Sequence, residues 1–182
     1  MILIGLGANI PFQKTGSPRA TCGAALEQMA RSGIRISRRS QWYESAPVPV
    51  SEQPWYVNGV VVGETAFSAT DLVDRLLEIE LSFGRRRDEI NGPRTLDLDL
   101  ISYDSAVIDS LTERGHSIRV PHPRLAERAF VLLPLRDVAP DWRHPSLGYS
   151  IDDLIERMPD GQETRLMSDA GGVFGTEWIA AN

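Results

Sequence analysis

The sequence contains very little cysteine: Cys22 is the only one among 182 residues. An intramolecular disulfide is therefore excluded. A lone thiol inside RATCGAALEQ is more typical of a small core residue than of a nucleophile. The low cysteine content fits a reducing compartment, so we expect a cytoplasmic protein.

Long hydrophobic runs are also absent. No stretch reaches the roughly 18 apolar residues that indicate a membrane-spanning helix. The first ten residues, MILIGLGANI, lack the basic start and long apolar region of an export signal. With 182 residues, of which 42% are hydrophobic, we expect one well-buried, soluble domain with no membrane partner.

Lysine is the third scarce residue: Lys14 is the only one among nineteen basic residues, and the other eighteen are arginines. The formal net charge of -6 argues against a broad nucleic-acid-binding surface, which usually needs a basic excess. Genomic base composition would explain the number of arginines. It would not explain why Arg85, Arg86, Arg87 and Arg94 fall so close together.

Glycines are missing where common nucleotide-binding motifs require them. Residues 8–15, ANIPFQKT, end in the Lys-Thr pair of a P-loop, but Ala8 and Gln13 occupy the glycine positions. Gly5 and Gly7 have the dinucleotide-binding spacing, but Ile10 stands where the third glycine belongs. A nucleotide, if bound, is therefore held by another arrangement.

Hydrophobic periodicity predicts alternating strands and helices. Period-2 alternation or short apolar runs mark strands, and apolar residues at helical spacing mark helices. The predicted order is strand 2–8, helix 18–31, strand 34–41, proline-rich loop 46–54, strand 55–67, helix 71–84 and strand 95–108. This βαββαβ order predicts an α+β fold with a mostly antiparallel sheet and its helices on one face.

The pattern is less regular beyond residue 108. We expect an extended segment from Ser117, a turn at the two prolines around His122, and then a short apolar helix. Residues 150–158 are predicted as a last amphipathic helix with Ser150 as its cap. The tail from Gly161 shows little periodicity, so we predict one domain over 1–160 and a loosely structured tail over 161–182.

Two aspartates interrupt the apolar strand in residues 92–104, GPRTLDLDLISYD. Residues two apart in a strand point to the same side, so leucines form one face, and the other consists of Asp97, Asp99, Ile101 and Tyr103. The two carboxylates would lie about 7 Å apart at the backbone and repel each other without a cation between them. Oxygen ligands of this kind suit Mg²⁺ or Mn²⁺. A solvent-facing strand with incidental acids is the alternative.

The arginine cluster adjoins this pair in the sequence. Arg85, Arg87 and Arg94 offer planar guanidinium groups to phosphate oxygens, which a metal on the aspartates would also bridge. The combination is typical of phosphoryl transfer, in which the protein positions groups and neutralises charge. A solvated charged loop would also explain the arginines.

His122 and several aromatic residues are further candidates. Pro121 and Pro123 hold His122 extended, so its imidazole could donate to a phosphate oxygen, whereas a packed structural histidine is the alternative. The aromatic residues could belong to the core. Two of them flank the proline-rich loop, however, and an aromatic sandwich with an amide such as Asn58 would suit a flat heterocycle.

Four segments together resemble the 6-hydroxymethyl-7,8-dihydropterin pyrophosphokinase family. They are GLGAN, YESAPVPVSEQPWYVNGVV, FGRRRDEINGPRTLDLDLI and VPHPRLAERAFVLLPL, and the likeness runs from about Ile2 to Trp142. The Gly-Pro-Arg-x-x-Asp-Leu-Asp signature in the third is the most specific. The resemblance implies transfer of the terminal diphosphate of ATP to the pterin hydroxymethyl group, with release of AMP, in the folate pathway. It also implies a ferredoxin-like α+β sandwich.

The resemblance implies roles for individual residues. Asp97 and Asp99 correspond to the ligands of two Mg²⁺ ions. Arg94, His122 and Arg128 correspond to groups that hold the phosphates of ATP, the co-substrate; Glu80 corresponds to a nucleotide-side position, and Arg85 and Arg87 to loop arginines that close over the substrates. The pterin pocket is implied at Ser45, Ala46, Val48, Tyr56, Asn58 and Phe130, with Tyr56 and Phe130 on either side of the ring. On this interpretation, residues 1–160 are a monomeric pterin pyrophosphokinase domain acting on small molecules.

Two other functions compete with this interpretation. A ferredoxin-like binding module would leave the aspartates as surface acids and use the arginine loop to contact RNA or a protein. A metal-dependent phosphotransferase for a different heterocycle would keep the metal and phosphate groups and change only the pocket.

Overall fold

The computed structural model describes residues 1–85 and 92–168. The strands are β1 (Ile2–Ala8), β2 (Arg35–Arg39), β3 (Tyr43–Ser45), β4 (Tyr56–Glu64), β5 (Asp97–Tyr103), β6 (Ile108–Leu111), β7 (Ser117–Val120) and β8 (Thr164–Leu166). The helices are α1 (Pro18–Arg31), α2 (Ala69–Ser82), α3 (Ala129–Val138) and α4 (Ile151–Glu156), with a short 3-10 helix, η1 (Leu125–Glu127).

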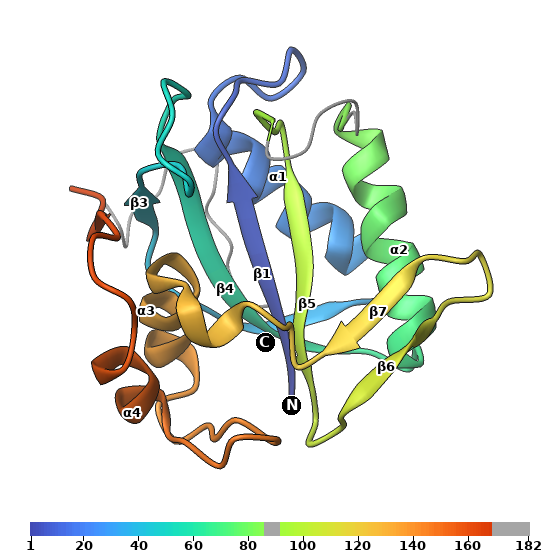
Figure 1. Cartoon of the computed structure of the whole chain (residues 1–182). Helices are drawn as coiled ribbons and strands as arrows, with labels where there is room; N and C mark the ends of the chain where they lie inside the picture. The colour runs from blue at the N-terminus through green and yellow to red at the C-terminus, as the bar shows by residue number, and fades with distance from the viewer. Residues whose placement is uncertain (86–91, 169–182) are drawn as a thin grey trace.

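A six-stranded antiparallel sheet forms the centre of the molecule (Figure 1). Its order is β5-β1-β4-β3-β8, and β2 also pairs with β4. Strands β6 and β7 form a separate hairpin beside the β5 edge. The predicted α+β fold with a mostly antiparallel sheet is therefore confirmed.

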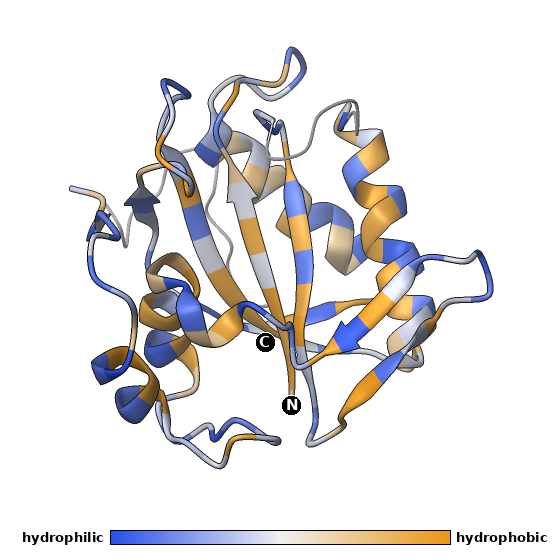
Figure 2. Cartoon of the chain, in the orientation of Figure 1, coloured by the Kyte–Doolittle hydropathy of each residue, from blue (hydrophilic) through white to orange (hydrophobic). Residues whose placement is uncertain are grey.

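Helices cover both faces of the sheet. Helices α1 and α2 lie behind it in the view of Figure 1, and their apolar side chains share a core with residues such as Leu98. Helices α3 and α4 lie on the opposite face, where Leu132 packs with Leu3 and Ile101. Figure 2 shows apolar positions along the strands and along the sheet-facing sides of these helices. The expectation of helices on one face holds only for the first two.

Side-chain caps determine where the helices begin. The Ser17 hydroxyl accepts a hydrogen bond from Ala20 N–H at 3.2 Å, at the start of α1. Helix α2 begins at Ala69, slightly earlier than predicted, because the Ser68 hydroxyl caps it by accepting from Asp71 N–H at 3.2 Å. Ser150 caps α4 as predicted, in a reciprocal capping box with Asp153.

Two predicted strands are interrupted. The predicted strand 34–41 ends early as β2, and the chain then passes through the fully buried Trp42 before β3 begins. The predicted strand 95–108 ends at Tyr103, because Asp104 adopts a positive φ of 50° and begins a turn. Burial of one aromatic side chain and a local turn both override the simple alternation.

A β-bulge in β5 changes which residues share a face with the aspartates. The register with β1 shifts where Leu3 faces Ser102 and Ile4 faces Leu100, so Ile101 is the additional residue. Ile101 stays on the α3 side, as predicted, whereas Tyr103 packs against the α1–α2 core and donates to Phe67 O at 2.7 Å. The prediction that Tyr103 shares the aspartate face is wrong.

The segment after Gly161 contains structure where a loose tail was expected. Strand β8 pairs antiparallel with β3, and Glu163 O accepts a hydrogen bond from Ala46 N–H at 3.0 Å. The Gln162 side chain accepts from Ala129 N–H at 2.9 Å and donates to Glu127 O at 2.7 Å. This segment therefore braces both the loop after β3 and the start of α3.

None of the helices formed by residues 1–85 and 92–168 is both long and apolar enough to cross a bilayer.

Candidate active site

A pocket of about 350 Å³ opens on the α3 side of the sheet. Its walls come from β1, β4, β5, the loop after β3 and the segment from His122 into α3. They include many of the predicted site residues, namely Ser45, Ala46, Val48, Tyr56, Asn58, Arg94, Asp97, Asp99, His122, Arg128 and Phe130. Residues from four separate sequence segments therefore meet at one cavity.

Glycines on β1 keep the floor of this pocket low. Gly7 faces Asp97 and Gly5 faces Asp99 across the β1–β5 ladder. A Cβ atom at Gly5 would approach Ile101 Cδ1 to 3.1 Å, and one at Gly7 would lie 3.5 Å from Asn58 Oδ1. A side chain at Gly5 would therefore press against Ile101, whereas one at Gly7 would make ordinary contact and occupy space beside Asn58 and Asp97.

The end of the pocket near β3 and β4 is lined by aromatic and amide groups. Asn58 and Ser45 are both buried, and Asn58 Nδ2 donates to Ser45 Oγ at 2.9 Å. Tyr56 and Phe130 also line the pocket, and the Arg128 guanidinium lies over the Phe130 ring at 5.4 Å. This combination of flat apolar surfaces and an oriented amide can bind a polar heterocycle.

The opposite end holds the carboxylates. Arg94 hydrogen-bonds Asp97 Oδ2, and Arg85 Nη1 lies 2.5 Å from Asp97 Oδ1. The Arg85 contact lacks hydrogen-bond geometry, so Oδ1 is buried without a hydrogen-bond donor among the described residues. The Asp99 side chain makes no hydrogen bond or ion pair within residues 1–85 and 92–168. Acceptor capacity is therefore left over at both aspartates.

Electrostatics at Asp99 favour binding of a cation. Burial, reinforced by the neighbouring Asp97 charge, raises the Asp99 pKa from 3.8 to about 6, although Arg128 opposes the shift. A carboxylate with a raised pKa gains free energy when positive charge arrives beside it. The repulsion expected between the two aspartates is thus present in the folded protein.

Glu80 and Arg85 lie behind the aspartates rather than in the pocket wall. Glu80 is 1% exposed, and its Oε1 accepts from Leu98 N–H at 2.6 Å and pairs with Arg85. Burial raises the Glu80 pKa, and Arg85 counteracts this effect. Arg85 therefore bridges the buried Glu80 and Asp97. Arg87, the second loop arginine of the prediction, lies outside the described residues.

His122 is positioned from both sides. Its backbone N–H donates to Ile101 O at 2.9 Å, which fixes it beside β5. Its Nδ1 accepts from Arg124 N–H at 3.2 Å, so the proton of the neutral ring lies on Nε2. Burial, followed by the Arg128 charge, lowers the His122 pKa to about 4. At neutral pH, His122 is therefore a neutral group with one N–H to donate.

A second cavity of about 480 Å³ adjoins the first. It lies between α2, the outer edge of β5 and strand β7, and of the residues that the structure describes it shares only Asp99 and His122 with the first pocket. Leu98 N–H points away from β1, toward Glu80, so Leu100, two residues on, presents its backbone groups to the same outer side. Asp99 and His122 thus mark the boundary between two cavities.

Sequence reasoning missed a residue that joins these parts. Asn9, 2% exposed, accepts from Arg94 N–H at 2.7 Å through Oδ1. Its Nδ2 donates to Gln53 Oε1 and Pro54 O, each at 3.2 Å. Asn9 is the final residue of the GLGAN motif, and its place in that motif is the sequence feature that could have identified it. It ties the loop after β3 to the Gly-Pro-Arg segment.

Comparison with known proteins agrees with this arrangement. Residues 3–140 match the model of the family described as 7,8-dihydro-6-hydroxymethylpterin-pyrophosphokinase, HPPK. The chain is 40% identical over 157 residues to the 2-amino-4-hydroxy-6-hydroxymethyldihydropteridine pyrophosphokinase of Synechocystis sp., covering 86% of this chain and 75% of that protein. It is 38% identical to the protein of the same name from Pseudomonas aeruginosa, covering 87% of this chain and 91% of that protein.

Solved structures extend the comparison to the fold. A crystal structure of wild-type HPPK-DHPS from Plasmodium falciparum, with pteroate, superposes with a TM-score of 0.65 at 13% identity. The match covers 86% of this chain and 44% of that longer one. At this identity the likeness supports the fold alone. Because the family model and the two bacterial relatives agree over most of its length, the chain belongs to the HPPK family.

Proposed function

We propose that the pocket above Asp97 and Asp99 is the catalytic site of this chain. As an HPPK, the chain is a 2-amino-4-hydroxy-6-hydroxymethyldihydropteridine pyrophosphokinase of folate synthesis, which transfers the diphosphate of ATP to the pterin and releases AMP. One observation supports the site assignment above the others. Two under-coordinated carboxylates and several arginines lie where an aromatic- and amide-lined pocket meets a second cavity.

The pterin would occupy the end of the first pocket near β3 and β4. Tyr56 and Phe130 would lie against the two faces of the ring. Asn58 and Ser45 would bind its polar edge, together with backbone groups near Ala46 and Val48. The hydroxymethyl group would then point along the glycine-lined floor toward the aspartates.

ATP would approach from the second cavity. The unpaired backbone edge of β5 at Leu100 offers a donor and an acceptor to a planar base, and apolar side chains of α2 and β7 cover that edge. A triphosphate leaving this cavity must pass Asp99 and His122, the residues common to both cavities. Glu80 would act on the nucleotide side by fixing β5 through Leu98 rather than by contacting the base.

The donor set fits Mg²⁺. In the part of the chain that the structure describes, no group of three or more His, Cys, Asp or Glu side chains is arranged to hold a metal. Asp97 Oδ1 is nevertheless buried without a hydrogen-bond donor, and the Asp99 side chain makes no hydrogen bond among the described residues. Mg²⁺ typically combines one or two carboxylates with substrate phosphates and water. Two Mg²⁺ ions shared with ATP would neutralise phosphate charge and lower the pKa of the attacking hydroxyl.

The remaining charged groups would position the phosphates. Arg94 and Arg128 offer guanidinium groups, and neutral His122 offers Nε2–H. Arg85 and Arg87 would close over the bound substrates and exclude water, for which Arg85 would have to leave Glu80 and Asp97. The pterin hydroxyl oxygen would attack the β-phosphorus in line. The bond between the β-phosphorus and the bridging oxygen would break, and that oxygen would leave with AMP. We also expect a monomer that acts in the cytoplasm, with residues 1–160 as the catalytic domain.

Pterin-dependent AMP formation tests this function. The protein should convert ATP to AMP only when 6-hydroxymethyl-7,8-dihydropterin and Mg²⁺ are both present. Asp97→Asn should lower the rate at least about 10³-fold, because stabilisation of phosphoryl charge supplies several kcal/mol. Asp109→Asn, which changes an exposed acid on β6 with 75% side-chain exposure, is the control and should keep the rate. ATP turnover with unrelated alcohols, or an active Asp97→Asn variant, would contradict the assignment.

A further inference from the structure

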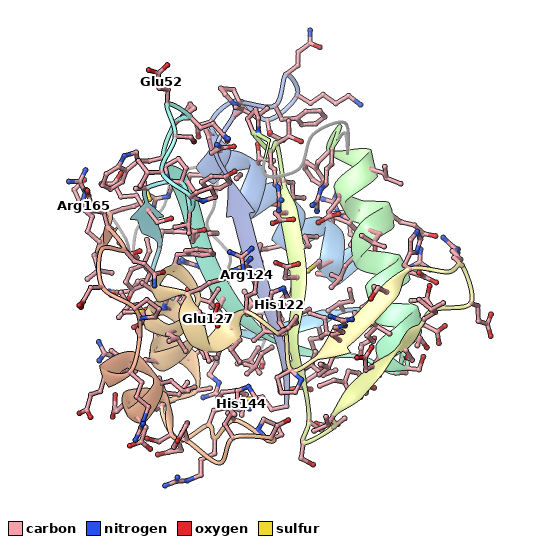
Figure 3. The ribbon with its side chains drawn as sticks, viewed as in Figure 1. Glu52, His122, Arg124, Glu127, His144 and Arg165 are labelled. Carbon is pink, nitrogen blue, oxygen red and sulfur yellow. The ribbon has the colours of Figure 1, made fainter. Side chains whose placement is uncertain are left out.

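Arg124 is a pocket residue to which neither the sequence motifs nor the proposed function assign a role. It follows Pro123, lines the first pocket and is exposed. Figure 3 shows Arg124 and His122 together in front of the sheet. The Arg124 side chain has no carboxylate partner or hydrogen bond within residues 1–85 and 92–168. Its charge is therefore available to a ligand.

The other described arginines at the pocket are already engaged. Arg94 contacts Asp97, which Arg85 also contacts from behind the pocket wall. Arg128 lies over the Phe130 ring. Arg124 is thus the described pocket arginine without such a contact, and an anion could bind it without first displacing a protein group.

The Arg124 charge already acts on the groups around it. Burial is the largest cause of the lowered pKa of His122, followed by the Arg128 charge, and the Arg124 charge lowers it further. Burial is also the largest cause of the lowered pKa of Arg128, to which the Arg124 charge adds. Three potential phosphate donors are therefore close enough to influence one another. Converging like charges cost free energy in an empty site, and an anion between them recovers that cost.

The two cavities indicate which part of the substrate Arg124 would reach. Asp99 and His122 line both cavities, whereas Arg124 lines only the first, where the pterin is proposed to bind. With the nucleoside in the second cavity, as proposed, a group that lines only the first cavity lies on the side away from the nucleoside. It can serve the phosphates that move onto the pterin.

We propose that Arg124 binds the diphosphate during its transfer and in the pterin diphosphate product, an inference that rests on the proposed function. The pterin hydroxyl oxygen forms a bond to the β-phosphorus, and the bond from that phosphorus to the α–β bridging oxygen breaks. The electron pair of the broken bond leaves on AMP, and the hydroxyl proton passes to water. Arg124 stays with the β- and γ-phosphates on the pterin side, and Asp99 and His122 lie at the boundary of the two cavities.

Kinetics of Arg124→Ala, Arg124→Gln and Arg124→Lys test the proposal. Loss of the guanidinium should lower kcat/KM by about tenfold to hundredfold, the size expected for lost hydrogen bonds to a charged group, and lysine should recover part of it. Inhibition by magnesium pyrophosphate should weaken about tenfold or more in the alanine and glutamine variants. Inhibition by AMP should change less than about twofold, because AMP remains on the other side of His122.

Arg136→Ala is the matched control, since Arg136 lies on α3, does not line the pocket, and among the described residues forms an ion pair with Asp152 alone, at 3.8 Å. It should retain wild-type kinetics. Thermal unfolding of every variant checks the fold, and Arg124 is exposed, so little change is expected. An Arg124→Ala rate within twofold of wild type, or equal weakening of AMP and pyrophosphate inhibition, overturns the proposal. Absence of pterin-dependent AMP formation by the wild-type protein would instead refute the proposed function itself.

Discussion

Asp99→Asn should stabilise the metal-free protein while abolishing its activity. In the folded state the Asp99 pKa rises from 3.8 to about 6 through burial and the Asp97 charge. An acid whose pKa is higher in the folded than in the unfolded state destabilises the fold once it ionises. The cost is small below pH 4, grows as pH rises from about 4 to 6, and is complete above that range.

The size of the effect follows from the pKa change. A rise of about 2 corresponds to about 3 kcal/mol at pH 7.5. Partial solvent access and relaxation of Asp99 reduce this value, so we expect a gain of roughly 1–3 kcal/mol from the neutral, nearly isosteric amide. At pH 4.5 the gain should shrink to about a third, roughly 0.3–1 kcal/mol, because the folded-state carboxyl is then protonated and only the ionisation of the unfolded chain still contributes.

Urea unfolding in EDTA at pH 4.5 and 7.5 measures this difference. Asp109→Asn, on the exposed face of β6, is the control and should change stability by less than about 0.5 kcal/mol at either pH. Adding Mg²⁺ with ATP should stabilise the wild-type protein and have much less effect on Asp99→Asn, since the variant lacks a proposed ligand. An Asp99→Asn variant that is less stable than wild type at pH 7.5, or a gain that does not depend on pH, would refute the reasoning.

Two further predictions concern the pterin end of the pocket. Phe130→Ala should raise the KM for the pterin about tenfold and leave the KM for ATP nearly unchanged, because it removes one face of the proposed ring-binding site; equal increases in both KM values would contradict this role. Gln162→Ala should lower the free energy of unfolding by about 1–2 kcal/mol and raise the pterin KM, since its hydrogen bonds to Ala129 N–H and Glu127 O brace the start of α3. Glu163→Ala, which keeps the backbone bond to Ala46, is the control in urea unfolding and kinetics, and unchanged values for Gln162→Ala would refute a bracing role.

Local sequence patterns were enough to predict most of the elements. Strand β1 and helix α1 have the predicted bounds, and Ser150 is the cap of α4. These features depend on neighbouring residues, through side-chain periodicity and hydrogen bonds to nearby backbone groups. The same short-range logic placed Asp97 and Asp99 on one side of β5, where they line one pocket.

The patterns failed where distant segments altered local geometry. Alternation in residues 95–108 predicts Tyr103 beside the aspartates. The bulge at Ile101 instead turns the Tyr103 side chain toward the core beneath α1 and α2. The tail from Gly161 lacks periodicity because β8 is three residues long and depends on β3 for its hydrogen bonds. Neither the β1 register nor the open edge of β3 is visible in the local sequence.

The sequence by itself determined the chemical inventory: two spaced carboxylates, clustered arginines, a histidine between prolines, and four motifs that resemble one family. Tertiary structure decided how these groups combine. It paired Arg85 and Arg94 with Asp97, placed Asp99 and His122 at the boundary of two cavities, and left Arg124 facing only one of them. The physical reason is that burial, ion pairing and cavity shape depend on atoms from segments far apart in the chain, whereas side-chain periodicity carries information about near neighbours only.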